Sequence, residues 1–375
     1  MLPFQIIVTL LTFVATSIFA LLHENTAIVS YHIVFSIGII PLILAAMVHF
    51  LPVLARSKKP SKWINLLPLL ALLSGLLITS HFAFPQVTTT GHYFGATVII
   101  FVVANLGIWA FHLKSQCIGT PHPCLDWYLA AIYCLLIALS AIVITYFIPS
   151  QRAEFRLLHL HLNTLGFIGI TALGTLQVLM PTVAQCPDPA VASRMRQHLK
   201  WMVIGTFMIA FCAAWYPKLA WVGVTLLAIP VFGITQSWLQ LYREKIFKWN
   251  GSAPVLASAL SGFVIALVIG TAHAYGQHHF NPIALFIIIF MMPLVMGAAS
   301  YLLPLWLKPG QQTIWHQTSR AYLAANGALR ALIFLVGGIL VSLGYETGWY
   351  LVALAAGAFL AKTIKLLIPQ IKGIT

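Results

Sequence analysis

Charged residues are scarce in this chain. Only 7% of its 375 residues are Asp, Glu, Lys or Arg, and Asp and Glu together number just six, whereas 61% are hydrophobic. Soluble domains carry about 25% charged residues. The composition therefore excludes a soluble globular domain and predicts an integral membrane protein that crosses the bilayer many times.

Cysteine is also uncommon. The chain has five cysteines, without a pattern of paired spacing, so we expect no disulfide framework. Cys117 and Cys124 enclose the loop CIGTPHPC, close to His112 and His122. Sulfur and imidazole together suit copper or zinc, but the spacing of these cysteines does not match a standard zinc knuckle. The pattern favours free thiols.

Long hydrophobic runs dominate the rest of the sequence, and short connections separate them. They predict an all-α protein with a single transmembrane domain over residues 1–375. We expect twelve spans, at 3–22, 28–54, 63–84, 91–113, 125–148, 157–183, 198–216, 218–241, 253–275, 282–307, 319–343 and 347–369.

The basic residues orient these spans. The net charge is +14, and most Lys and Arg residues fall in the connections on one side, whereas only Arg152, Arg156 and Lys218 fall on the other. The positive-inside rule then places both termini in the cytoplasm. Anionic membrane lipid is a sufficient partner for this charge, and we expect no nucleic-acid partner.

Three spans close in a similar way, which predicts an internal repeat. Spans 2, 6 and 10 end in HFLPVL, QVLMPTV and YLLPLWL. His32 and His161 each precede the proline of their span, Pro52 or Pro181, by twenty residues. The third copy keeps Pro304 but has Ala284 in place of the histidine. We predict three four-helix units, about 1–115, 116–243 and 244–375, in a pseudo-threefold arrangement.

Span 6 carries the most informative stretch, LLHLHLNTLGFIGITALGTLQVLMP. An imidazole within a membrane span is costly and marks a candidate functional site. His159 and His161 are two residues apart, so at about 100° per residue their side chains leave the helix roughly 200° apart. This spacing predicts a helix that serves two neighbouring sites. Histidines also concentrate at the predicted outer ends of the spans, among them His32, His81, His92, His273, His278 and His279.

The pattern H-x-H-x-x-x-L-G-F, with a closing proline, resembles a known haem-ligand helix. His159, His161, Leu165–Phe167 and Pro181 carry it here. It is similar to the tenth helix of the haem-copper oxidase catalytic subunit, especially the C-family (cbb) oxidases and nitric oxide reductases. The resemblance implies one or two b-type haems, with His159 as the high-spin ligand and His161 as the low-spin ligand. It also implies electron transfer to, or binding of, oxygen or nitric oxide.

The same resemblance implies further ligands, which this sequence supplies only in part. His32 stands at the place of a copper ligand, and His81 and His92 are candidates to complete a copper site. Span 10 has no histidine to serve as the second axial ligand of the low-spin haem, so His278 and His279, just before it, are the nearest candidates. Arg156 and Arg330 are candidates to pair with haem propionates. An electron donor or small partner subunits at the periplasmic face are implied as well.

Two other interpretations stay open. NnrS-type proteins, which are twelve-helix haem proteins linked to nitric oxide metabolism, carry a similar helix, and their compact size suits this chain. No acidic residue lies deep in any span, so a proton path is not visible, which favours a non-catalytic haem or copper sensor or assembly factor over a proton-pumping oxidase. A haem-free transporter with twelve helices and a buried arginine is the second alternative. Whether the protein is an enzyme is therefore left open.

Overall fold

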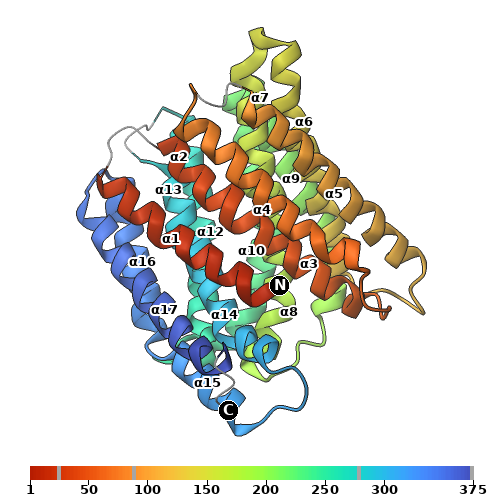
Figure 1. Ribbon diagram of the computed structural model, residues 1–375, viewed down its shortest axis with the longest axis vertical. Helices are drawn as coiled ribbons and strands as arrows, with labels where there is room; N and C mark the ends of the chain where they lie inside the picture. Colours follow the sequence, from red (N-terminus) through yellow and green to blue (C-terminus); the bar gives the residue numbers. More distant parts are fainter. Residues whose placement is uncertain (23–26, 87–89, 277–279, 372–375) are drawn as a thin grey trace. The chain divides into compact units, whose positions relative to one another are not determined.

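The protein is an all-α polytopic membrane protein. The computed structural model describes residues 1–22, 27–86, 90–276 and 280–371, and all regular structure in these residues is helical. Twelve helical spans in them are long and apolar enough to cross a membrane, which confirms the predicted fold class (Figure 1). The span boundaries agree with the predicted ones to within a few residues, except that spans 6, 7 and 11 begin earlier, at Pro149, Val191 and Ile314.

Most spans are single helices. These are α1 (Leu2–Leu22), α4 (Lys62–Ala83), α5 (Gly91–Ser115), α6 (Cys124–Phe147), α9 (Val191–Trp215), α10 (Ala220–Leu241, after the 3₁₀ turn η4, Pro217–Leu219), α12 (Ser252–Ala274) and α17 (Thr347–Ile371). The short helix α11 (Arg243–Ile246) lies in a connection.

Spans 2, 6, 10 and 11 are composite. Span 2 consists of α2 (Ala27–His32), η1 (Ile33–Ile39) and α3 (Ile40–Leu54). Span 6 consists of η2 (Pro149–Gln151), α7 (Arg152–His161), η3 (Leu162–Ile170) and α8 (Thr171–Ala184). Span 10 consists of α13 (Pro282–Leu285), η5 (Phe286–Met291) and α14 (Met292–Leu307), and span 11 of α15 (Ile314–Ala324) and α16 (Gly327–Ser342).

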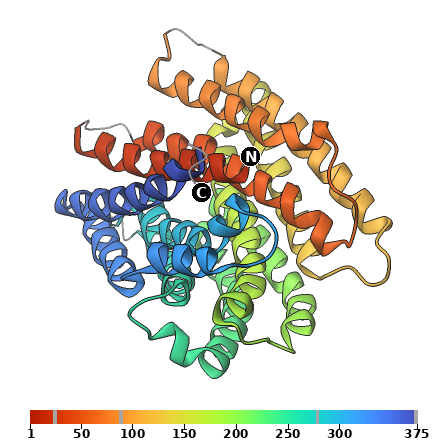
Figure 2. The same ribbon diagram turned by 60° about the horizontal axis from the view of Figure 1, so that its bottom comes forward.

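The helices form two compact units. The terminal unit comprises residues 1–30, 179–187 and 235–375, and the central unit comprises 31–178 and 188–234. In the terminal unit α17 packs on α16 and α1, and α12 packs on α14 and α16. In the central unit α4 packs on α5, α5 on α6, and α7 on both α6 and α9; the orange pair α4 and α5 is seen side by side in Figures 1 and 2. The division into three repeat units stays a prediction.

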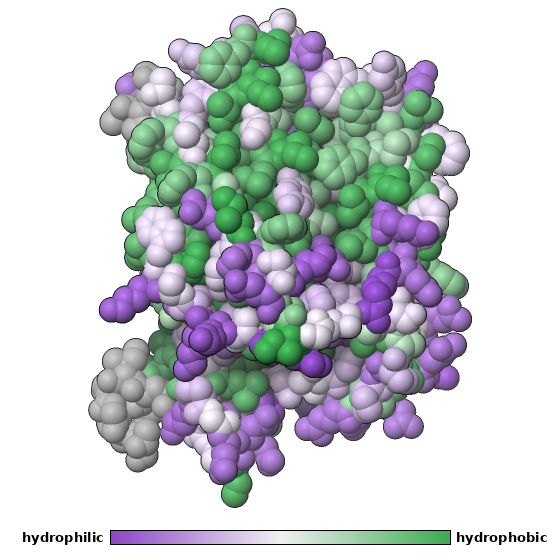
Figure 3. All heavy atoms as spheres, turned by 90° about the vertical axis from the view of Figure 1, so that its right-hand side faces the viewer, coloured by the Kyte–Doolittle hydropathy of each residue, from purple (hydrophilic) through white to green (hydrophobic). Residues whose placement is uncertain are grey.

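The helices present large apolar side chains to the surrounding lipid. On α5 four such residues, about two turns or one turn apart, have exposed fractions of 56–71%, namely Phe94, Phe101, Ile108 and Phe111. A stripe of this kind is stable only against hydrocarbon, since soluble proteins avoid large exposed apolar patches. Hydrophobic residues cover a broad band of the face shown in Figure 3, and hydrophilic residues gather below it.

The three spans with matching ends share an unusual local structure. Each contains a π-helical segment, η1, η3 or η5, followed by an α-helix that includes a proline, namely Pro52, Pro181 or Pro304. A π segment inserts an extra residue into the helical turn and occurs frequently at functional sites. In spans 2 and 6 the segment begins directly after His32 and His161. The three spans therefore share a local form, and the division into three repeat units stays a prediction.

Pairs of small residues bring the next helix close in all three parts of the chain. Ser74 in α4 donates a hydrogen bond to the carbonyl oxygen of Gly95 in α5, at 2.6 Å. A Cβ atom added to Gly205 in α9 would lie 2.8 Å from the carbonyl oxygen of Gly223 in α10. At α16 a Cβ added to Gly337 would lie 3.2 Å from the carbonyl oxygen of Gly348 in α17.

Ser74, Gly205 and Gly337 are each followed by a small residue that faces a π segment, namely Gly75, Thr206 or Gly338. A Cβ added to Gly75 would collide with the carbonyl of Ser36 in η1, and one added to Gly338 would collide with the side chain of Ile289 in η5. Thr206 occupies the equivalent place beside Gly166 of η3. Close approach of helix backbones through small residues is a common way to pack helices in lipid. The same packing thus recurs three times along the chain.

Span 11 is broken, whereas the sequence analysis predicts one helix over 319–343. α15 ends at Ala324, and Asn326 adopts a left-handed conformation with φ 57°. Asparagine tolerates this conformation better than most residues do. The connection before α12 fills the break: the Gly251 amide donates to the Ala324 carbonyl at 3.0 Å, and the Ala328 amide to the Trp249 carbonyl at 3.0 Å. These bonds satisfy backbone groups that a break in a membrane span would otherwise leave unpaired.

Candidate functional site

The two histidines of span 6 are both held through Nδ1. His159 Nδ1 lies 2.9 Å from the carbonyl oxygen of Ala138 in α6, and His161 Nδ1 lies 2.8 Å from that of Leu157. A carbonyl oxygen only accepts, so each Nδ1 carries the hydrogen and each Nε2 keeps its lone pair. This tautomer, fixed by a backbone carbonyl, is the one that metal-ligating histidines commonly use. Both rings are half-buried.

The two Nε2 atoms differ in their surroundings. His159 Nε2 lies 3.5 Å from the side-chain nitrogen of Asn163, one turn further along the helix. The Asn163 side-chain oxygen is buried and has no hydrogen-bond partner among the described residues. His161 Nε2 receives no hydrogen bond from the described part of the chain. One ring therefore offers an open lone pair, and the other is held by a single long contact.

The helix changes form directly after His161. All nine residues of η3 are buried, and Gly166 lies against Cys134 of α6, where an added Cβ would be 2.7 Å from the Cys134 Cβ. The glycine pattern of the sequence thus allows close contact between span 6 and its neighbour. The residues of η3 are as apolar as those of an ordinary span, so hydropathy does not predict the π-helical form.

A second group of histidines lies at one end of α2, α4 and α5 in the central unit. The rings of His81 and His92 stack with centroids 4.1 Å apart. Phe82 separates His32 from this pair, with centroid distances of 4.2 Å to His32 and 5.9 Å to His92. Across the described residues, no group of three or more His, Cys, Asp or Glu side chains is placed to hold a metal ion. The structure gathers the three predicted copper ligands in one region but with an aromatic ring among them.

The remaining predicted site residues lie in different surroundings. Arg156 is exposed on α7, one turn before His159. Arg330 belongs to the terminal unit, where its Nη1 donates to the Leu323 carbonyl at 3.2 Å and its guanidinium lies 4.6 Å from the centre of the Phe359 ring. His278 and His279 lie outside the described residues. The propionate and second-ligand assignments therefore stay predictions.

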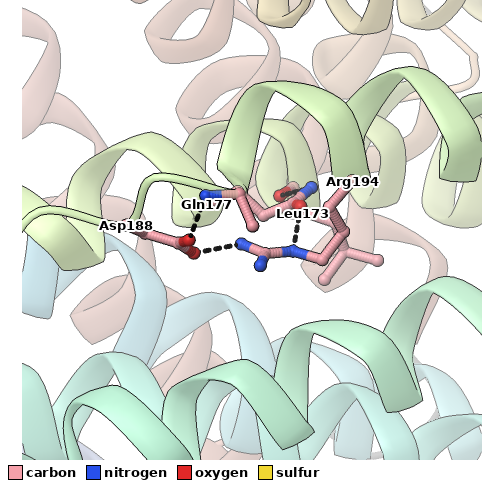
Figure 4. Close-up of polar contacts among 5 residues, drawn as sticks. Leu173, Gln177, Asp188 and Arg194 are labelled. Carbon is pink, nitrogen blue, oxygen red and sulfur yellow. Dashed lines mark hydrogen bonds and ion pairs between the residues drawn. The ribbon is translucent and has the colours of Figure 1, made fainter.

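Sequence reasoning missed a buried ion pair in the central unit (Figure 4). Arg194 Nη2 lies 2.6 Å from Asp188 Oδ2, and their side chains are 10% and 2% exposed. Arg194 Nε also donates to the side-chain oxygen of Gln177 at 3.2 Å, and Gln177 in turn donates to the Leu173 carbonyl at 3.3 Å. The contacts tie the start of α9 to span 6. Only the rarity of acidic residues could have drawn attention to Asp188.

The loop around Cys117 and Cys124 is ordered by a histidine. His122 Nδ1 accepts a hydrogen bond from the Cys124 amide at 3.2 Å, and the His122 amide donates to the Leu54 carbonyl at 3.2 Å. Burial, and then the positive charge of Arg196, lower the pKa of His122. The His122 Nδ1 lone pair is therefore used by the backbone, and the described residues of this loop bring no three His, Cys, Asp or Glu side chains together to hold a metal ion.

No protein-family model, curated protein or solved structure matches the chain.

Proposed function

We propose that this chain is a b-type haem-binding protein of the bacterial inner membrane, with both termini in the cytoplasm. Its implied role is electron transfer to, or binding of, oxygen or nitric oxide, as in the haem-copper oxidase and NnrS families that span 6 resembles. The observation that carries the proposal is the shared tautomer of His159 and His161. In each ring a backbone carbonyl holds Nδ1, so the lone pair lies on Nε2, which is open in His161 and meets only the long Asn163 contact in His159.

The residues present fit a haem on several counts. The two side chains leave the helix in opposite directions, so one helix can serve two haems. Arg156 is exposed one turn before His159, where its guanidinium can pair with a propionate. Haem iron, when bound, supplies a centre that exchanges one electron or takes up a diatomic gas. For His159 to bind iron, the 3.5 Å contact with Asn163 has to open.

Spectroscopy of two single variants tests this proposal. The protein is expressed with a haem supply, purified in detergent, and examined by visible absorption with and without carbon monoxide. We expect His161→Ala to remove the low-spin component and His159→Ala to remove the carbon monoxide-binding component. His112→Ala, which changes an exposed histidine on α5, serves as the matched control and should leave both components intact. Loss of both components in all three variants would show that the histidines act through folding and would contradict the proposal.

A non-catalytic sensor or assembly factor is the second candidate, and the second histidine group favours it over an enzyme. The ring of Phe82 lies 4.2 Å from His32 and 5.9 Å from His92, so an aromatic side chain shares the region where His32, His81 and His92 would have to hold a metal ion. Metal analysis together with oxygen and nitric oxide consumption assays separates the two. An enzyme shows turnover, whereas a sensor binds haem without consuming either gas.

The break in span 11 does not favour the haem-free transporter. In transporters, the ends of discontinuous helices are free to contact the substrate. Here Trp249–Gly251 occupy the break and pair with the backbone on both sides of it.

A further inference from the structure

The terminal unit buries a guanidinium whose donors are only partly used. Arg330 lies in the first turns of α16 and is 7% exposed. Its Nη1 donates to the Leu323 carbonyl at 3.2 Å, but Nε and Nη2 are buried with no acceptor among the described residues. Buried charged groups without partners are costly. The arrangement indicates that an acceptor outside the protein completes this site.

A second cation lies beside it. Lys362 on α17 is half-buried, and its Nζ lies 3.5 Å from the carbonyl oxygen of Ala325, at the break in span 11. The same ammonium lies 5.7 Å from the centre of the Tyr322 ring. Phe359, on which the Arg330 guanidinium stacks, precedes Lys362 by about one turn of α17. The Arg330 guanidinium therefore packs on α17 about one turn from the place where Lys362 leaves the same helix.

Neither cation forms an ion pair with an acidic side chain among the described residues, where the two ion pairs are Lys114 with Asp126 and Arg194 with Asp188. Arg320, by contrast, has protein acceptors for two of its donors, since its Nε donates to the Tyr301 carbonyl at 3.3 Å and its Nη1 to the Gln312 side chain at 3.0 Å. Arg320 Nη2 is also buried without an acceptor among the described residues, but Arg330 has two such nitrogens and only one that is bonded.

We propose that Arg330 and Lys362 bind a phosphate group at the break in span 11, carried by an anionic lipid headgroup or by free inorganic phosphate. The planar guanidinium presents paired N–H donors that match phosphate oxygens, and an ammonium adds a second charge. Basic pockets between membrane helices on the cytoplasmic side commonly bind anionic headgroups. Lys362 is the more exposed of the two, so the phosphate meets the ammonium first and the buried guanidinium second. This site is independent of the haem proposal.

Lipid retention is the test. The wild type and the variants Arg330→Gln, Arg330→Lys, Lys362→Gln and Lys365→Gln are purified in detergent, incubated with phosphatidylglycerol or phosphatidylcholine, and analysed by native mass spectrometry. We expect the wild type to prefer phosphatidylglycerol at least tenfold. Arg330→Gln and Lys362→Gln should each lower the affinity for phosphatidylglycerol at least tenfold. Arg330→Lys should lower it less, because lysine keeps the positive charge but lacks the paired N–H donors of the guanidinium. Lys365→Gln, an exposed change on the same helix, should behave as the wild type.

A thermal-shift series with inorganic phosphate distinguishes the two sources. Stabilisation by phosphate in lipid-free detergent, lost in Lys362→Gln, identifies a free anion as ligand, whereas stabilisation by phosphatidylglycerol alone identifies a lipid. Lys362→Gln removes a half-buried side chain, so it tests the site even if Arg330→Gln does not fold. Equal phosphatidylglycerol retention by the wild type and Lys362→Gln, with no stabilisation by inorganic phosphate, would overturn the proposal.

Discussion

At the residue scale, backbone carbonyl groups determine the tautomer of His159 and His161. Both rings carry their hydrogen on Nδ1 because a carbonyl oxygen lies within 3 Å of each. The spacing of His159 and His161 predicts that their side chains leave the helix in roughly opposite directions. Spacing does not predict the Ala138 carbonyl, which comes from a different helix, or the Asn163 contact, which depends on a side-chain rotamer.

At His122 the structure predicts a dependence of stability on pH. The pKa of His122 is lowered from its ordinary value of 6.5, first by burial and then by Arg196. The unfolded chain therefore binds a proton more readily than the folded protein, so the free energy of unfolding falls as the pH drops below about 6.5. Protonation also removes the acceptor for the Cys124 amide.

Thermal unfolding in detergent between pH 7.5 and pH 5.5 measures this effect. We expect the wild type to lose stability towards low pH and His122→Asn, which keeps an acceptor that does not titrate, to lose less. Identical slopes in the two proteins would mean that other histidines account for the whole dependence.

At the scale of elements, the π segments depend on close contact with their neighbours. A Cβ on Gly262 of α12 would collide with the backbone carbonyl of Ile289 in η5, where little can move. Overpacking of this kind costs about 1–3 kcal/mol. We expect Gly262→Ala to lower the unfolding temperature clearly.

Gly270 on the same helix is the matched control. A Cβ there meets nothing within 4 Å, so Gly270→Ala should leave stability unchanged or raise it, by up to about 1 kcal/mol, through helix propensity. The two variants are compared in one thermal-shift series. Equal effects would show that the approach of α12 to η5 is not as tight as described.

The ion pair of Asp188 and Arg194 gives a second prediction at this scale. Because the pair is buried, removing one partner leaves an uncompensated charge, which costs about 3–5 kcal/mol. We expect Arg194→Ala to be severely destabilised in detergent, and Arg194→Ala with Asp188→Asn to recover part of the loss.

The exposed pair of Lys114 and Asp126 provides the comparison. It has the same 2.6 Å separation, but its side chains are 40% and 38% exposed. An exposed pair contributes about 0–1 kcal/mol, so Lys114→Ala should change the unfolding temperature little. If Arg194→Ala and Lys114→Ala lowered the unfolding temperature equally, burial would not explain the difference expected between the two ion pairs.

For the molecule as a whole, hydropathy located all twelve spans because lipid imposes a minimum apolar length on each. Hydropathy did not place the break in span 11 because it averages over a long window, whereas the local signal is the turn dipeptide Asn326-Gly327. Matching span ends indicated three related parts, and the shared π segments and small-residue contacts agree with them. Side-chain groupings such as His32, Phe82 and His92 arise from contacts between spans, and spacing along one span does not determine them.

The central claim is that the chain holds a b-type haem through span 6. The visible absorption spectrum of the wild-type protein, expressed with an ample haem supply and purified in detergent, tests it most directly. The account predicts a Soret band that co-purifies with the chain and shifts on reduction. A correctly folded preparation without a Soret band would contradict it.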